Sequence, residues 1–124
     1  MTKPLILIIE DHPTVSVVFS QALRDFHFDV EIIANGRKAL DRLQNVTPQL
    51  LLLDLHLPHV SGQQILQHIR QIDRFANTKV ILMTADVLAY DNISQTDETI
   101  LLKPISIHTL RDLVKDLNGV DKHQ

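Results

Sequence analysis

Residues that could bind a metal ion or a phosphoryl group follow short apolar segments at four places in the sequence. They are Glu10 with Asp11, then Asp54, then Thr84, and finally Lys103. Three carboxylates brought close together repel one another unless a cation lies among them. Carboxylate oxygens in that number suit Mg²⁺. The Lys103 ammonium and the Thr84 hydroxyl could then contact phosphoryl oxygens, so the set is suited to phosphoryl transfer.

Each of these residues taken alone has a plainer explanation. An acidic residue or a threonine after a strand commonly caps the helix that follows it. The joint pattern favours function, because ligands of open parallel sheets bind beyond the carboxyl ends of the strands. The elements that position the set therefore decide whether it forms one site.

Short apolar segments alternate with helical patterns along the chain. The predicted strands are 5–9, 30–33, 50–53, 80–83 and 99–102. Apolar residues at helical spacing predict helices around 15–26, 39–43, 65–72 and 110–117, with the third capped by Ser61 and the last closed by Gly119. The stretch 85–98 has room only for a short helix. This βαβαβαβαβα order predicts an α/β fold whose parallel sheet is covered on both faces.

Length and composition exclude several classes of protein. The 124 residues fit one domain, and 44% apolar with 22% charged residues are typical of a globular chain. A net charge of −3 gives no basic surface, so we expect no direct nucleic-acid binding. No apolar run approaches the ~20 residues of a membrane span, and no signal peptide is recognised. The absence of cysteine excludes disulfides and thiolate metal sites and permits a reducing cytoplasm.

The chain resembles the receiver (CheY-like) domain of bacterial two-component response regulators from Leu5 to about Leu117. The motifs that carry the resemblance are Glu10-Asp11, Asp54-Leu55-His56-Leu57-Pro58-His59-Val60-Ser61-Gly62, Met83-Thr84-Ala85 and Lys103-Pro104. The resemblance implies a flavodoxin-like three-layer αβα sandwich with five parallel strands in the order 2-1-3-4-5 and a short or irregular fourth of five helices. We expect a single receiver domain over 1–124, with a core at 4–118 and a polar tail at 119–124.

The same resemblance implies a function and a role for each site residue. Asp54 would accept a phosphoryl group from a phosphohistidine on a sensor histidine kinase or a histidine phosphotransfer protein. Mg²⁺ would be held by Glu10, Asp11, Asp54 and the backbone carbonyl of His56, while Thr84 and Lys103 would contact the phosphoryl oxygens. The Lys103–Pro104 bond is expected to be cis. Such a chain is a cytoplasmic signalling phosphoacceptor, not a conventional enzyme, and it switches an unknown downstream effector.

Other functions make different demands on the sequence. A haloacid-dehalogenase-type phosphatase needs an acid two residues after its nucleophile, where this chain has His56. A flavin binder needs a phosphate loop after the first strand, where Glu10 and Asp11 would repel the phosphate. A transition-metal site formed by His12, His56 and His59 is a weaker alternative, since Pro58 separates the last two. A receiver-shaped interaction module that works without phosphorylation remains open.

Two departures from the family pattern concern the face that normally carries output. Ile100 stands where a switching Tyr or Phe is usual, and a β-branched side chain cannot make the same rotamer change. The stretch from Thr84 to Lys103 is shorter than usual by about one helical turn (~3.6 residues). Tyr90 is the single tyrosine and could replace the missing ring by position, although a plain packing role is the simpler interpretation.

Overall fold

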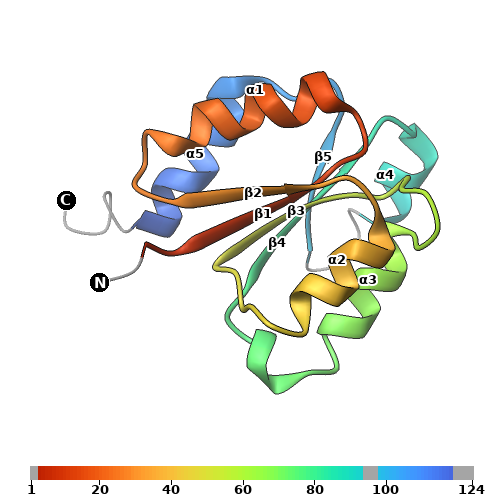
Figure 1. Ribbon diagram of the computed structural model, residues 1–124. Helices are drawn as coiled ribbons and strands as arrows, with labels where there is room; N and C mark the ends of the chain where they lie inside the picture. The colour runs from red at the N-terminus through yellow and green to blue at the C-terminus, as the bar shows by residue number, and fades with distance from the viewer. Residues whose placement is uncertain (1–2, 94–97, 119–124) are drawn as a thin grey trace.

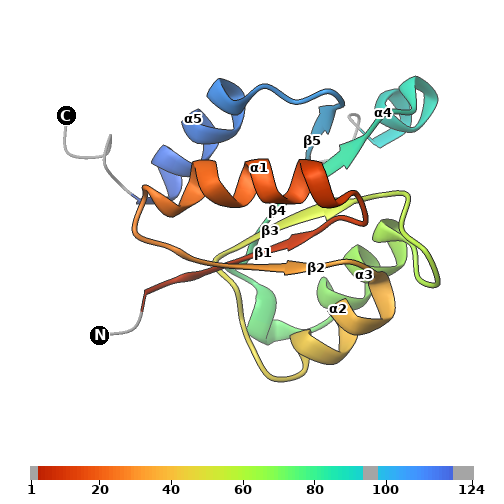
Figure 2. The ribbon, with the colours of Figure 1, turned by 45° about the horizontal axis from the view of Figure 1, so that its top comes forward.

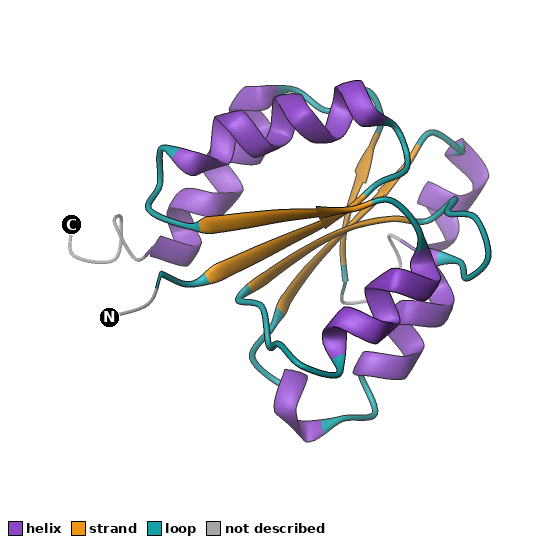
Figure 3. Ribbon diagram, viewed as in Figure 1, coloured by secondary structure: helices purple, strands orange, loops and turns teal. Residues whose placement is uncertain are grey.

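Five parallel strands form a single sheet in the computed structural model, which describes residues 3–93 and 98–118. The strands are β1 (Leu5–Ile9), β2 (Asp29–Ile33), β3 (Leu50–Asp54), β4 (Lys79–Thr84) and β5 (Thr99–Leu102). Their order is β2-β1-β3-β4-β5, as predicted, and their arrows all point toward one end of the sheet (Figure 3). Residues that follow the strands therefore gather at that end.

Helices cover both faces of the sheet and make the predicted three-layer sandwich (Figure 1). One face carries α1 (Pro13–Arg24) and α5 (Ile107–Asn118). The other carries α2 (Gly36–Leu43), α3 (Gly62–Ile69), the short α4 (Val87–Ile93) and a 3₁₀ turn, η1 (Asp73–Phe75). The view in Figure 2 shows α1 across the first face and α2 with α3 on the second. None of the helices in the described residues is long and apolar enough to cross a membrane.

Alternation along the buried strands divides the core into two apolar layers. Every residue of β3 is buried, and its side chains point alternately to the two faces. Leu51 and Leu53 pack with the helices α2, α3 and α4, whereas Leu50 and Leu52 pack with α1 and α5. A strand buried on both faces reads as a continuous apolar run, which is why the central strands were predictable.

Local hydrogen bonds fix where the helices near the site begin. The Asn35 side chain accepts a hydrogen bond from the Lys38 backbone N–H and caps α2. Ser61 caps α3 as predicted, and its hydroxyl and the Gln64 side chain form a reciprocal capping box. These caps set the direction in which each helix leaves the loop that precedes it.

The apolar patterns that predict α1 and α3 continue past the ends of the observed helices. Phe26 follows the end of α1 and Ile72 follows the end of α3, yet both still pack against the core from the turns. Within α1, Val18 is 44% exposed and does not join the buried stripe. The 3₁₀ turn was not predicted, and the predicted closure by Gly119 and the tail at 119–124 lie outside the described residues.

Two glycines allow the loop after β3 to pack closely against its neighbours. A Cβ on Gly62 would collide with the carbonyl oxygen of Asp54 and would lie 2.8 Å from the Cα of Leu55. A Cβ on Gly36 would collide with the carbonyl oxygen of Val60 and would lie 2.8 Å from the Cβ of that residue. Backbone atoms cannot yield as flexible side-chain ends do, so both positions exclude larger residues.

The substitution Gly62→Ala should therefore destabilise the chain by ~1–3 kcal/mol, the usual cost of overpacking. Chemical denaturation measures this change in the free energy of unfolding. The matched control is Gln63→Ala, an exposed neighbour in the same helix, which should stay within about 0.5 kcal/mol of the parent. Equal stability of the two variants would contradict the close approach at Gly62.

Candidate functional site

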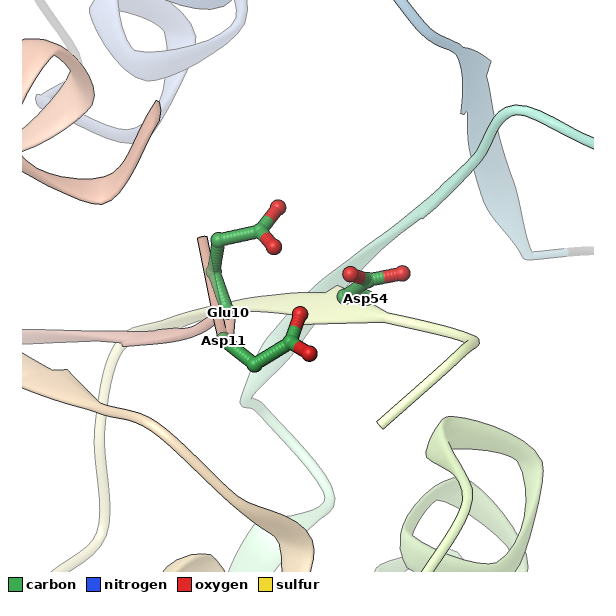
Figure 4. A group of neighbouring side chains, drawn as sticks. All are labelled: Glu10, Asp11 and Asp54. Carbon is green, nitrogen blue, oxygen red and sulfur yellow. The ribbon is translucent and has the colours of Figure 1, made fainter. Parts of the chain in front are cut away.

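Three carboxylates meet at the carboxyl end of the sheet. Glu10 and Asp11 follow β1, Asp54 ends β3, and oxygens of all three lie within 4.8 Å of one another. Figure 4 shows the three side chains turned toward a common space. Among residues 3–93 and 98–118 this is the one group of three or more potential ligands drawn from His, Cys, Asp and Glu.

The ammonium of Lys103 lies between two of these carboxylates. Its Nζ is 2.7 Å from Oε1 of Glu10 and 3.1 Å from Oδ2 of Asp54. The two acids are only 1% and 3% exposed, whereas Asp11 is open to solvent. Lys103 directly follows β5, and its ammonium offsets negative charge that is buried at the carboxyl ends of β1 and β3.

Burial and charge move the pKa values of this cluster away from their ordinary range. Burial raises the pKa of Glu10, and the neighbouring Asp54 raises it further against the opposing effect of Lys103. Burial alone would lower the pKa of Lys103, but hydrogen bonds to Glu10 and Asp54 outweigh it and leave that pKa raised. Lys103 is therefore held as an ammonium ion.

Each buried carboxylate is also held by a backbone N–H two residues further along the chain. The N–H of His12 donates to Oε2 of Glu10 at 3.2 Å, and the N–H of His56 donates to Oδ1 of Asp54 at 3.0 Å. Lys103 contacts the other oxygen of each. Both acids are consequently fixed by two partners, which orients them before any ligand arrives.

The donor set fits a divalent cation with oxygen ligands. Three carboxylates share one ammonium, so the ionised cluster keeps a formal charge of −2, opposite to that of Mg²⁺. Oxygens on opposite sides of Mg²⁺ lie about 4.2 Å apart, twice the ~2.1 Å ligand distance. Carboxylate oxygens that all lie within 4.8 Å of one another are thus close enough to share one ion, directly or with a water between one acid and the ion. Lys103 lies closer to Glu10 (2.7 Å) than to Asp54 (3.1 Å), so of these two acids Glu10 suits the water-mediated place better.

Thr84 completes this edge of the sheet at the end of β4. The residue is fully buried, and its hydroxyl accepts a hydrogen bond from the Asp86 backbone N–H at 3.0 Å. Nε2 of His56 lies 3.0 Å from the same hydroxyl oxygen. The Lys103 N–H donates to the Thr84 carbonyl at 2.7 Å, and the Lys103–Pro104 bond is cis, as predicted.

All of the predicted site residues thus lie at one end of the sheet, but two contacts were not foreseen. The His56 side chain, considered above only as part of a transition-metal site, reaches the Thr84 hydroxyl instead. The Asp86 carboxylate accepts from the N–H groups of Leu88 and Ala89 at the start of α4. An aspartate just before an apolar helical pattern is a recognisable cap signal, whereas nothing local signals the His56 contact.

The structure also bears on the histidines and on the output residues. In the described part of the chain, none of the histidines joins a cluster of three metal-ligating side chains. Ile100 is 8% exposed and packs in the apolar layer beneath α2, α3 and α4. Tyr90, on α4, packs partly buried against that layer, in keeping with the plain packing role.

Comparison with known proteins finds a family for this chain. A family profile described as "Response regulator receiver domain" matches residues 6–115. Sporulation initiation phosphotransferase F of Bacillus subtilis is 33% identical over 119 residues, which cover 93% of this chain and 94% of that protein. Response regulator Rre1 of Synechocystis is 34% identical over 122 residues. The sensor histidine kinase TmoS of Ectopseudomonas mendocina is 30% identical over 118 residues.

The chain spans only part of several relatives. It matches 53% of the length of Rre1 and 12% of the length of TmoS, with 94% and 93% of this chain covered.

Solved structures agree with the sequence matches. The receiver domain of the sensor histidine kinase PA1611 of Pseudomonas aeruginosa, solved with a magnesium ion in its active-site cleft, superposes with a TM-score of 0.81 at 25% identity, covering 94% of this chain and 98% of that one. The receiver domain of a LuxO repressor protein of Vibrio parahaemolyticus gives 0.80 at 31% identity, with 97% and 93% covered.

Titration with Mg²⁺ should shift the amide resonances of residues near 10, 11, 54 and 56, because the carboxylates converge there. Binding should be weak, since Mg²⁺ keeps much of its hydration until another anionic ligand arrives. Asp11→Ala should weaken it about tenfold or more, as losses around metal ions commonly do. The control is Asp41→Ala, an exposed acid of α2. An unchanged titration in Asp11→Ala would show that Asp11 is not a ligand.

Proposed function

The chain belongs to the response regulator receiver domain family, and we propose that it accepts a phosphoryl group from a phosphohistidine donor onto Asp54. Receiver domains are signalling phosphoacceptors that pair with histidine kinases, not conventional enzymes. The observation that supports this proposal is the environment of the Asp54 side chain. Its buried carboxylate is held between the His56 N–H and the Lys103 ammonium, within reach of two further acids.

The transfer exchanges one bond to phosphorus for another. A carboxylate oxygen of Asp54 attacks the phosphorus, the bond from phosphorus to the donor imidazole nitrogen breaks, and that nitrogen keeps the electron pair. The product is an aspartyl phosphate and a free imidazole. Positioning and charge neutralisation carry most of the catalysis in such transfers. Asp11, Asp54 and the His56 carbonyl would hold Mg²⁺, with Glu10 contributing through water, and the bound ion would supply positive charge beside the phosphoryl oxygens.

The remaining residues act directly on the phosphoryl group in this proposal. Lys103 places an ammonium beside the carboxylate that is modified. The ammonium therefore needs only a small movement to contact the negatively charged phosphoryl oxygens. Thr84 ends the strand next to β3 and offers a hydroxyl to another phosphoryl oxygen. Both groups are already anchored by their backbones at the sheet edge.

The wider role follows from the family. We propose that 1–124 forms a single receiver domain that works in the cytoplasm, with a sensor histidine kinase or a histidine phosphotransfer protein as its donor. Phosphorylation would then change its binding to a downstream effector. The second candidate, an interaction module that works without phosphorylation, is favoured by Ile100, which lacks the ring of the usual switch. Phosphorylation of Asp54 decides between the two.

Incubation with acetyl phosphate and Mg²⁺ should add one phosphoryl group to the intact mass of the protein. Asp54→Asn should abolish the addition, because the amide is a poor nucleophile, and removal of Mg²⁺ by EDTA should do the same. Asp73→Asn, a change at an exposed acid of η1, is the matched control and should behave as the parent. A parent that gains no mass, or an Asp54→Asn variant that gains as much, would exclude the phosphoacceptor role.

Phosphorylation should alter amide exchange over residues 84–93 without an aromatic rotamer change. The reason is that α4 has seven residues and presents Val87 and Leu88 to solvent, so it opens at low cost in free energy. The change should be a few-fold, since a switch without a ring gives a small difference between its two states. Hydrogen exchange with and without phosphodonor measures it. A response confined to α1 and α5, with 84–93 unaltered, would place the output elsewhere.

A further inference from the structure

The side chain of His56 connects two strands of the site in a way that its family role does not require. Its backbone N–H holds Asp54, while its imidazole reaches across to the Thr84 hydroxyl with a 3.0 Å contact. We propose that His56 is a positioning residue that restrains Thr84 in the unphosphorylated chain. It thereby competes with the phosphoryl group for the Thr84 hydroxyl. The inference rests on the proposed role of Thr84 as a phosphoryl contact.

Hydrogen-bond capacity at Thr84 makes the two uses of its hydroxyl compete. A hydroxyl offers one proton and two acceptor positions. One acceptor position is taken by the Asp86 N–H. When the imidazole accepts at Nε2, it takes the single proton that a phosphoryl oxygen needs. When it donates there, it takes the second acceptor position and fixes the oxygen toward the imidazole. In the first case Thr84 must leave His56 before it can donate to a phosphoryl oxygen. In the second case its proton stays free, but the two donors to its oxygen fix the direction in which that proton can point.

The surroundings of the two side chains determine which of them can be changed safely. Thr84 is fully buried, whereas His56 is exposed apart from this contact. Replacing the imidazole therefore removes little packing. It also leaves the N–H that holds Asp54 and the carbonyl proposed for Mg²⁺, because both belong to the backbone. The side-chain contact can thus be tested apart from the rest of the site.

Beryllium fluoride with Mg²⁺, a mimic of a phosphoryl group on a carboxylate, is the probe. An ordinary net hydrogen bond corresponds to about a three- to tenfold change in an equilibrium constant. His56→Ala should therefore bind the mimic three- to tenfold more tightly than the parent. His56→Gln should restore the parent affinity to within about twofold, because a glutamine amide extends about as far as Nε2. In a Thr84→Val background, His56→Ala should change nothing.

A second measurement needs neither metal nor mimic. The ¹⁵N resonance of Nε2 in His56 should move in Thr84→Val, because the isosteric change removes the hydroxyl that this nitrogen contacts. An unmoved resonance would overturn the inference. Weaker or unchanged binding of the mimic by His56→Ala would do so as well, and so would an equal gain in both backgrounds. A parent that binds no mimic and takes no phosphoryl group overturns the proposed function itself, and this inference with it.

Discussion

The charge balance around Lys103 is the constraint on which the rest of the site depends. Two carboxylates lie almost wholly out of water at the ends of β1 and β3, and the ammonium that offsets them comes from the end of β5. An uncompensated buried charge costs about 3–5 kcal/mol. In the sequence, Lys103 lies 93 positions after Glu10 and 49 positions after Asp54. The order of the strands therefore brings the opposite charges together, and the contacts between these charges hold the strand ends in place. The cluster still keeps a net negative charge, which suits a divalent cation.

The sequence predicts the sheet and the gathering of the site well because both depend on local patterns. Short apolar segments mark most of the strands, which have four to six residues, and a parallel sheet then brings the carboxyl ends of the strands together. The helix ends are less predictable, since Phe26 and Ile72 pack from turns that look helical in a pattern of apolar residues. The contact of His56 with Thr84 depends on a side-chain rotamer and a loop path, which residue spacing does not encode.

The two departures from the family pattern are separated from the acidic residues. Ile100 lies in the apolar layer beneath α4, and the shortened connection contains α4 itself. The carboxylates, Lys103 and the cis bond at Pro104 are unaffected by either change. One end of the sheet can therefore retain its chemistry while the neighbouring face takes on a different way of signalling.

The close contact between Gly36 and Val60 has a consequence for chimeric proteins. The loop after β3 passes so near the first turn of α2 that its backbone occupies the space of a side chain at position 36. Loop 55–61 is therefore not an independent module. Grafting a relative's loop onto this chain means exchanging the beginning of α2 with it, because the two segments share one volume.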